Sequence, residues 1–279
     1  MAPITITTEG ARICLWLDGP LWQGKPAATL GSMTSRDMAS GRAALARALD
    51  QLRSRGIGQV IGPMEGDTWH SYRFVTESDG SPPFLLEPAN KPHEPELFRE
   101  AGFQPVGSYF SARVPLAETA AQTLVTSDDF TISTWSGTDP EMLFGQVYDL
   151  SVRAFSRNPF YKPVSKQDFL QMYLPVVPLI RKELILFATT PQGRLVGFLF
   201  GIPNHAEGPQ TQTVILKTYA SLMRGAGRHL AHAFHRNARA LGYQAAIHAL
   251  IHDDNLSALR SAAEGAEIFR RYTLFGLRL

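Results

Sequence analysis

Helical spacing and short runs of apolar residues alternate along the first half of the chain. Within residues 38–55, Leu45, Leu49 and Leu52 recur at the spacing of one helical face, which predicts a long helix. Gly56 follows this segment, as glycine often does at a helix end. A shorter helix is predicted at 94–101, and strands are predicted at 11–17, 27–33, 59–62 and 108–114.

The second half repeats this alternation with longer strands. The apolar runs 183–188 and 193–201 flank a short polar segment with proline and glycine, which predicts a hairpin. Further strands are predicted at 130–135, 213–219 and 244–251, closing strands at 268–279, and helices at 141–155, at 165–173 and in a segment that ends near Leu241.

Both halves follow a similar order of strands and helices, so we interpret the chain as two related units in tandem. The first unit spans 1–116, a linker of small and polar residues spans 117–127, and the second unit spans 128–279. The predicted fold class is α/β of the α+β type. Each unit is expected to hold a mixed, mostly antiparallel sheet flanked by helices.

Composition narrows the class of function. Of 279 residues, 44% are hydrophobic and 19% charged, which is typical of a globular protein, and the net charge of +2 gives no support to nucleic-acid binding. Cys14 is the single cysteine, which excludes an internal disulfide and favours a reducing compartment. We recognise no signal peptide and no apolar run of the roughly 18–20 residues that cross a membrane. We therefore expect a cytoplasmic protein with no nucleic-acid or membrane partner.

The most distinctive segment joins the predicted strand 213–219 to the helix after it. Here Arg224-Gly-Ala-Gly-Arg228 places two glycines between two arginines at the start of a helix. Glycines let the backbone approach a ligand closely, and the free N–H groups of a first helical turn point at an anion. The segment predicts a phosphate site formed by Arg224, Gly225, Ala226, Gly227, Arg228 and His229.

This loop resembles the acyl-CoA loop of the GNAT acetyltransferase superfamily, [Q/R]-x-x-G-x-[G/A], with Gly225 and Gly227 on its two small positions. The resemblance covers roughly residues 128–279. It includes Asn255, which matches an asparagine that starts a helix and contacts the cofactor in that family. The segment 96–103 resembles the ending of a GNAT unit, so the first half is interpreted as a degenerate unit without the loop.

The resemblance implies that acetyl-CoA, or another acyl-CoA, is the co-substrate. It also implies that the backbone of Lys217, Thr218 and Tyr219 holds the acyl carbonyl, as the corresponding strand does in the family. An oxyanion-type donor placed in this way contributes on the order of 3 kcal/mol.

Two positions depart from the family pattern. The first loop position, usually Gln or Arg, is Leu222, and Arg224 is the candidate to supply the missing charge. The tyrosine that protonates the leaving thiolate in many members is replaced by Ala262. Tyr219 is the candidate replacement acid, with a surface tyrosine as the alternative interpretation, and His252 is the candidate general base.

The acceptor contacts are expected from two loops. The segment 62–73 combines glycine, aromatic and charged residues, and Tyr161 lies between the two helices predicted at the start of the second unit. Loops in such positions often line a pocket. The candidates for contact with an amine-bearing acceptor are Glu65, Asp67, Trp69, Arg73 and Tyr161, and a structural loop around a buried tryptophan is the alternative.

No metal site is expected. His229, His232 and His235 recur every three residues, so two could share a metal, but three would strain, and no acidic residue lies near them in the sequence. His248, next to a predicted strand end, is a second candidate general base. The adjacent Asp253 and Asp254 are interpreted as capping residues of the helix after them.

These features predict an N-acyltransferase that transfers an acetyl or other acyl group from CoA to an amine of a small molecule or peptide. Two alternatives stay open. A non-catalytic acyl-CoA-binding or scaffold protein is favoured by Leu222 and Ala262. An aminoacyl transferase of the Fem kind also pairs GNAT-like units, but it uses aminoacyl-tRNA. A homodimer is left open as well.

Overall fold

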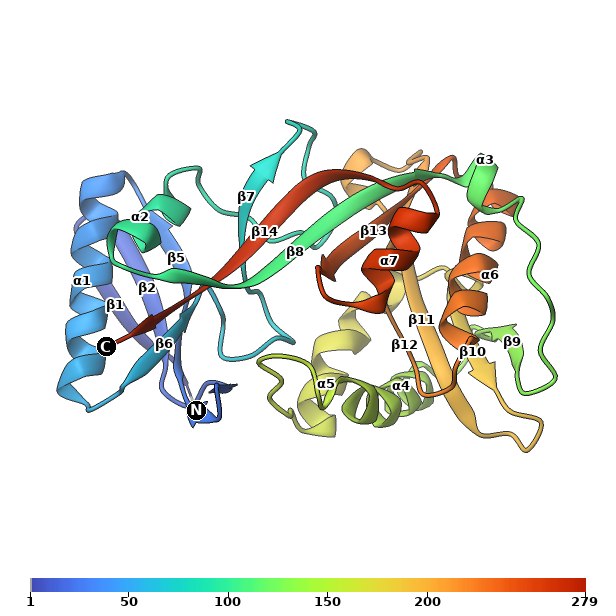
Figure 1. Cartoon of the computed structure of the whole chain (residues 1–279), viewed down its shortest axis with the longest axis horizontal. Coiled ribbons are helices and arrows are strands. Elements are labelled where there is room, and N and C mark those ends of the chain that lie inside the picture. Colours follow the sequence, from blue (N-terminus) through green and yellow to red (C-terminus); the bar gives the residue numbers. More distant parts are fainter. Residues whose placement is uncertain (1) are drawn as a thin grey trace.

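The computed structural model describes residues 2–279 and contains one long mixed sheet covered by helices (Figure 1). Twelve strands form this sheet, in the order β1-β2-β5-β6-β14-β8-β13-β12-β11-β10-β9, with β7 paired to β14 beside the path. The strands are β1 (Ile4–Thr8), β2 (Ala11–Trp16), β5 (Ala28–Ser35), β6 (Gln59–Gly62), β7 (Phe74–Ser78), β8 (Gln104–Pro115), β9 (Thr131–Thr134), β10 (Ile185–Thr189), β11 (Leu195–Pro203), β12 (Thr213–Ser221), β13 (Ala245–His252) and β14 (Glu267–Arg278). A separate small hairpin pairs β3 (Leu21–Trp22) with β4 (Lys25–Pro26).

The helices gather at the two ends of this sheet. They are α1 (Met38–Ser54), α2 (Glu94–Glu100), α3 (Leu116–Thr119), α4 (Pro140–Phe155), α5 (Lys166–Tyr173), α6 (Ala226–Ala240) and α7 (Leu256–Ala263), with 3-10 turns η1 (Leu174–Leu179), η2 (Lys182–Leu184) and η3 (His205–Glu207). Within residues 2–279, no helix is both long enough and apolar enough to cross a membrane.

The first half packs α1 and α2 against β1, β2, β5 and β6 (Figure 1). The predicted helical face is confirmed, because Leu45, Leu49 and Leu52 are all buried in this core. The helix ends before Gly56, whose φ of 71° lies in the left-handed region that glycine adopts without strain. Local spacing alone therefore located this helix and its end.

The second half has helices on both faces of its strands. Leu199 of β11 packs in the cluster that holds α6, whereas its neighbours Phe198 and Phe200 pack in the cluster that holds α4 and α5. Successive side chains of a strand point to opposite faces, so α6 and the α4–α5 pair cover opposite faces of the sheet. Strands buried on both faces explain the continuous apolar runs in this half.

Two long strands, β8 and β14, join the halves. β14 pairs with β8 over most of its length, and its last residues pair with β6, while β8 also pairs with β13 (Figure 1). The sequence predicted closing strands within the second unit. The structure instead has one continuous strand at 267–278 whose end lies in the first half. The sheet runs through both halves, so it marks no boundary between the two predicted units. The unit boundaries near 116 and 128 therefore stay a prediction.

The predicted fold class is confirmed, since most strand pairs are antiparallel and the exceptions are β5 with β6 and β12 with β13. Two strands of the long sheet were not predicted, β1 (Ile4–Thr8) and β7 (Phe74–Ser78), and neither was the small hairpin of β3 and β4. Part of the predicted linker is also helical, because α3 begins at Leu116.

Candidate functional site

The parallel strands β12 and β13 separate at their carboxyl ends. Their pairing runs from Thr213 opposite Ala245 to Leu216 opposite His248 and stops there. β12 nevertheless continues to Ser221 and β13 to His252. An opening between adjacent strands leaves backbone N–H and C=O groups free to bind a ligand, as at the carboxyl ends of strands in other α/β proteins.

The predicted phosphate loop lies directly after β12. Gly225 is the N-cap of α6, has a φ of 87°, and provides no side chain to cap the helix. Within residues 2–279, the backbone N–H groups of Gly225 and Gly227 donate no hydrogen bond. Arg224 and Arg228 are exposed beside them. Free amides, a helix N-terminus and two cations form an arrangement that attracts an anion.

Gly227 faces an arginine that the sequence did not single out. A Cβ atom at Gly227 would lie 2.8 Å from Nη1 of Arg260 on α7 and 3.3 Å from the ring of Tyr219. Nη1 of Arg260 lies 3.4 Å from the hydroxyl oxygen of Tyr219 and donates to it. Arg260 therefore lies between the loop and the end of β12, where a larger residue at 227 would displace it.

A cavity of about 720 Å³ extends from the opened strands toward the first half of the chain. Its volume is within the range of small-molecule sites. It is lined by residues of β12, β13, α4, α5 and α7 and by the segment 68–73. The predicted site residues that line it are Trp69, Arg73, Tyr161, Lys217, Thr218, Tyr219, His248, His252 and Asn255.

Two predicted acceptor contacts, Glu65 and Asp67, do not line this cavity. Glu65 accepts a hydrogen bond from the hydroxyl of Ser32 at 2.6 Å. Asp67 is buried and accepts from the backbone N–H groups of Trp69 and His70. These carboxylates hold the loop in shape, and Trp69, whose indole N–H donates to the carbonyl of Lys162 at 2.9 Å, reaches the cavity wall.

His252, the predicted base, is held by its neighbours. Its Nδ1 accepts the backbone N–H of Asp254 at 3.1 Å, and its ring packs edge-on against Tyr109. A neutral imidazole whose Nδ1 accepts carries its proton on Nε2. In this tautomer His252 offers the cavity a donor, and its role as general base stays a prediction.

A buried histidine pair lies at the wall between β13, α6 and α7. Nε2 of His235 and Nε2 of His248 are 3.0 Å apart, and Nδ1 of His248 lies 2.9 Å from the hydroxyl of Ser261. The carboxylate of Glu264 is 3.6 Å from Nε2 of His248. Burial lowers the pKa of His248 to about 4 and that of His235 well below its usual value.

Burial also raises the pKa of Glu264 to about 7, although Arg260 and Arg228 oppose the rise. Glu264, Ser261 and His248 all line the cavity. Neither Glu264 nor Arg260 was predicted as a site residue from the sequence. A usable signal was their position on and just after the helix that begins at Asn255, since residues three and four apart share one helix face.

His235, His248 and Glu264 are also the group of side chains, among residues 2–279, that could hold a metal ion. One ligand atom from each lies within 4.8 Å of the others. The planes of the two imidazole rings are nearly parallel, with centroids 5.2 Å apart, and their Nε2 atoms lie within hydrogen-bond distance of each other. As placed, one of the two Nε2 atoms donates a hydrogen bond to the other.

The other two histidines of the predicted series point elsewhere. Nε2 of His229 lies 2.9 Å from the carbonyl oxygen of Val125, and Nε2 of His232 lies 2.5 Å from that of Gln122. Both rings attach the linker segment to α6. His229 is thus next to the glycine loop, but both of its ring nitrogens lie close to backbone carbonyl oxygens, those of Gly225 and Val125.

The helix after β13 begins as predicted at Asn255, which is the N-cap of α7. The predicted capping by Asp253 and Asp254 is wrong, because no side chain caps this helix. Nη1 of Arg271 lies 3.8 Å from the carboxylate of Asp253, and the carboxylate of Asp254 lies 3.9 Å from His252. The side chain of Asn255 does not cap α7, and the residue lines the cavity.

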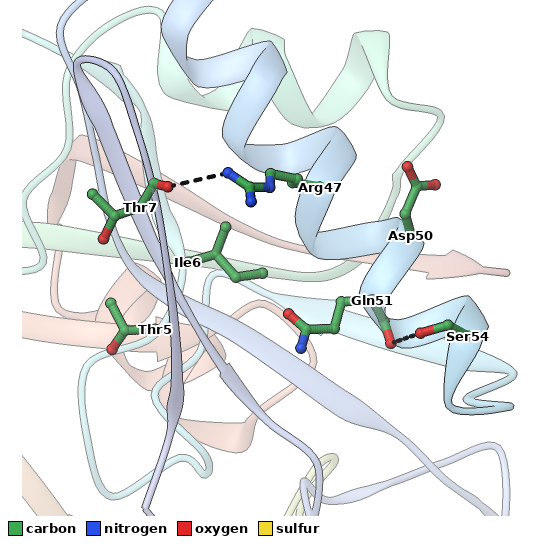
Figure 2. A pocket seen from close by; sticks show the side chains of 7 residues that line it. All are labelled: Thr5, Ile6, Thr7, Arg47, Asp50, Gln51 and Ser54. Atoms are coloured by element: carbon green, nitrogen blue, oxygen red, sulfur yellow. Dashed lines mark hydrogen bonds between the residues drawn. The ribbon is translucent and has the colours of Figure 1, made fainter.

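A second hollow lies in the first half, between β1 and α1 (Figure 2). Figure 2 shows Arg47 reaching across it toward the carbonyl oxygen of Thr7, at 3.5 Å. Apart from Ile6, its other lining residues are polar, and none is a histidine, cysteine or aromatic residue. The cavity at the opened strands is therefore the candidate site.

Neither a family model nor a curated protein matches this sequence. Solved structures do match. A GCN5-related N-acetyltransferase from Sphaerobacter thermophilus superposes with a TM-score of 0.58 at 14% identity, over 96% of this chain and 76% of that one. A tandem GNAT protein from the clavulanic acid biosynthesis pathway gives 0.56 at 14%, over 96% and 79%.

A longer protein from Enterococcus faecalis, described as a probable N-acyltransferase, gives a TM-score of 0.59 at 12% identity, and this chain spans 59% of its length. At such identities the likeness establishes the fold. The chain has the fold of the GCN5-related N-acetyltransferases, as the sequence analysis predicted.

Proposed function

We propose that the protein is an N-acyltransferase that uses acetyl-CoA or another acyl-CoA. The open N-terminus of α6, beside two strands that separate, is the observation that carries the proposal. The free amides of Gly225 and Gly227, with Arg224 and Arg228, would bind the pyrophosphate. The thioester would lie between β12 and β13, with the backbone from Lys217 to Tyr219 along its acyl group. Asn255 would contact the cofactor arm from α7.

The amine acceptor would occupy the cavity, with Trp69 and Tyr161 on its wall. A neutral amine attacks the thioester carbon, the carbon–sulfur bond breaks, and the attacking nitrogen loses a proton. Most of the rate would come from orientation and from polarisation of the carbonyl. We also propose that the chain consists of two GNAT-like units in tandem and acts in the cytoplasm. A homodimer is left open.

Glu264 is our candidate for the proton acceptor, directly or through water. A general base works best when its pKa lies near the working pH, and the pKa of Glu264 is about 7. Tyr219 is the candidate acid for the departing thiolate. Its hydroxyl oxygen already accepts from Arg260, whose positive charge would stabilise the tyrosinate after proton transfer.

The test is a calorimetric titration with acetyl-CoA, followed by measurement of thiol release with a panel of amines. Arg228→Gln should weaken acetyl-CoA binding by roughly tenfold, because one charge at a helix N-terminus and its hydrogen bond are lost. Arg236→Gln, an exposed arginine farther along the same helix, is the matched control and should bind normally.

Absence of acetyl-CoA binding in the wild-type protein would overturn the proposal. Micromolar binding without turnover of any amine would instead favour the non-catalytic acyl-CoA-binding protein, for which Leu222 in the loop and Ala262 on α7 are the supporting residues.

A further inference from the structure

Lys217 occupies an irregular position of β12, at the point where β12 leaves β13. Phe200 of β11 pairs with Thr218, and the next residue, Gly201, pairs with Leu216, so Lys217 is the extra residue of a β-bulge. A bulge redirects the side chain of its extra residue and is frequent beside active sites. The ammonium of Lys217 lines the cavity and donates to the carbonyl oxygen of Leu86 at 3.2 Å.

Arg73 approaches the same cavity from the first half of the chain. Its guanidinium carbon lies 3.8 Å from the ring centre of Tyr72 and 4.1 Å from that of Tyr109. Nη1 donates to the carbonyl oxygen of Leu250 at 3.2 Å, in the irregular part of β13. The residue is only 6% exposed, and its Nε is buried without a hydrogen-bond partner. The structure thus fixes a cation at the cavity wall and leaves one of its donors unused.

Neither cation has a carboxylate partner. Across residues 2–279, no carboxylate oxygen lies within 4.0 Å of a side-chain nitrogen of Arg73 or Lys217. Glu87, which also lines the cavity, is held by Arg270 at 3.4 Å and by the hydroxyl of Tyr272. Burial and the charge of Arg73 together lower the pKa of Lys217 to about 8, against a smaller opposing effect of the Glu87 carboxylate, so the two cations act on each other.

A buried and a half-buried cation on one cavity wall, neither with a carboxylate within ion-pair distance, repel each other, and a bound anion would offset that cost. The cations lie on separate elements, a bulge of β12 and the segment directly before β7, and both line the same cavity. Arginine is also the side chain best suited to carboxylate or phosphate, because its N–H groups form a planar fork.

We infer that Arg73 and Lys217 form an anion subsite, and that the acceptor is an amine that also carries a carboxylate or phosphate group. That the ligand is the acyl acceptor rests on the proposed function. That Arg73 and Lys217 bind an anion does not depend on it. The anionic group would contact Arg73 and Lys217, while the amine would extend toward the opened strands and Glu264.

The subsite can be tested without acyl transfer. Benzoate and its neutral isostere benzamide differ in charge and suit a cavity with aromatic walls, and phenylphosphonate represents the phosphate alternative. We expect benzoate or phenylphosphonate to bind the wild-type chain roughly tenfold or more tightly than benzamide, by calorimetry or by thermal shift, since charge-assisted hydrogen bonds are among the stronger ones. The tighter of the two anions identifies the group that the acceptor carries.

Lys217→Met removes the charge and keeps an unbranched apolar side chain. It should abolish the preference for the anion and raise the melting temperature of the ligand-free protein, because a half-buried cation that repels Arg73 is lost. Lys217→Arg should retain the preference. Lys25→Met, an exposed lysine on β4, is the matched control and should change neither value.

Equal binding of benzoate, phenylphosphonate and benzamide would overturn the inference, and so would a preference that survives in Lys217→Met. Acetyl-CoA is titrated separately with the same samples. If acetyl-CoA binds but the anions are not preferred, the subsite is wrong and the proposed function stands. If the anions are preferred but acetyl-CoA does not bind, the subsite stands and the proposed function is wrong.

Discussion

Two segments of this molecule share one arrangement and differ at one position. β5, α1 and β6 form a strand–helix–strand unit in which Ala28 pairs in parallel with Val60. β12, α6 and β13 form a second such unit in the other half. Each helix begins a few residues after its strand, and each has a buried apolar face. Local architecture alone would give both helices the same capacity to bind an anion.

The two helices differ in whether a side chain accepts hydrogen bonds from the backbone N–H groups at the N-terminus. At α1, the carboxylate of Asp37 accepts the backbone N–H of Ser40 at 2.8 Å, and these hydrogen bonds lower the pKa of Asp37 to about 2. The chain thus supplies its own anion. At α6, Gly225 supplies none, and two arginines stand beside the free amides. A helix N-terminus is therefore a ligand site only where the sequence leaves it uncapped.

The largest expected effect tests whether the chemistry belongs to the second half. In Glu264→Gln, kcat should fall by roughly a hundredfold or more, because general bases contribute on that order. In the wild type, the rate should rise with pH through about 7, where Glu264 ionises, and the variant should lose this step. The exposed Glu267→Gln is the control, and an unchanged pH profile in Glu264→Gln would exclude Glu264 as the base.

The same residue gives a stability test of known sign. The pKa of Glu264 is raised from 4.5 in the free side chain to about 7 in the fold. Its contribution to stability is therefore fully present below about pH 4.5 and is lost as the pH rises through 7. Urea unfolding at pH 5 and pH 8 should show a loss in the wild type that is smaller in Glu264→Gln. An equal loss in both proteins would contradict the raised pKa.

An intermediate effect is expected when the N-terminus of α6 is capped by a carboxylate, as Asp37 caps α1. Gly225→Asp places a carboxylate at the N-cap, so acetyl-CoA affinity should fall by at least about tenfold through repulsion and competition for the amides. Gly242→Asp, at a φ of 93° beyond the other end of α6, imposes similar backbone strain and should leave the affinity unchanged. Equal affinities in the two variants would remove the loop from the binding site.

The smallest effect is expected at α1. Asp37→Ala should lower the melting temperature by a few degrees at pH 7, since a capping carboxylate is lost, and should not change acetyl-CoA binding. Asp37 has a lowered pKa, so its contribution is present above about pH 3.8 and is lost as the pH falls through 2. Asp50→Ala, an exposed position of α1, is the control. A gain of acetyl-CoA binding at α1 would show that capping alone distinguishes the two helices.

Local sequence patterns determined the helices, most strands and the open glycine loop. The N-cap at Gly225 follows from neighbouring residues, because helix spacing and glycine conformation are set within a few positions. The same holds for the capping of α1 at Asp37, although only the structure showed that its carboxylate fills the site. Such features require no knowledge of distant contacts.

Only the tertiary structure decided which side chains share the cavity. Arg73 meets the carbonyl of Leu250, His235 meets His248, and β14 returns to pair with β6. These partners are set by strand register and by a bulge in each of β12 and β13, and a shift of one residue reverses the face of every side chain. The sequence thus determined where an anion could bind at the loop, and the sheet that joins the two halves determined the cavity in which Arg73, Lys217 and Glu264 lie.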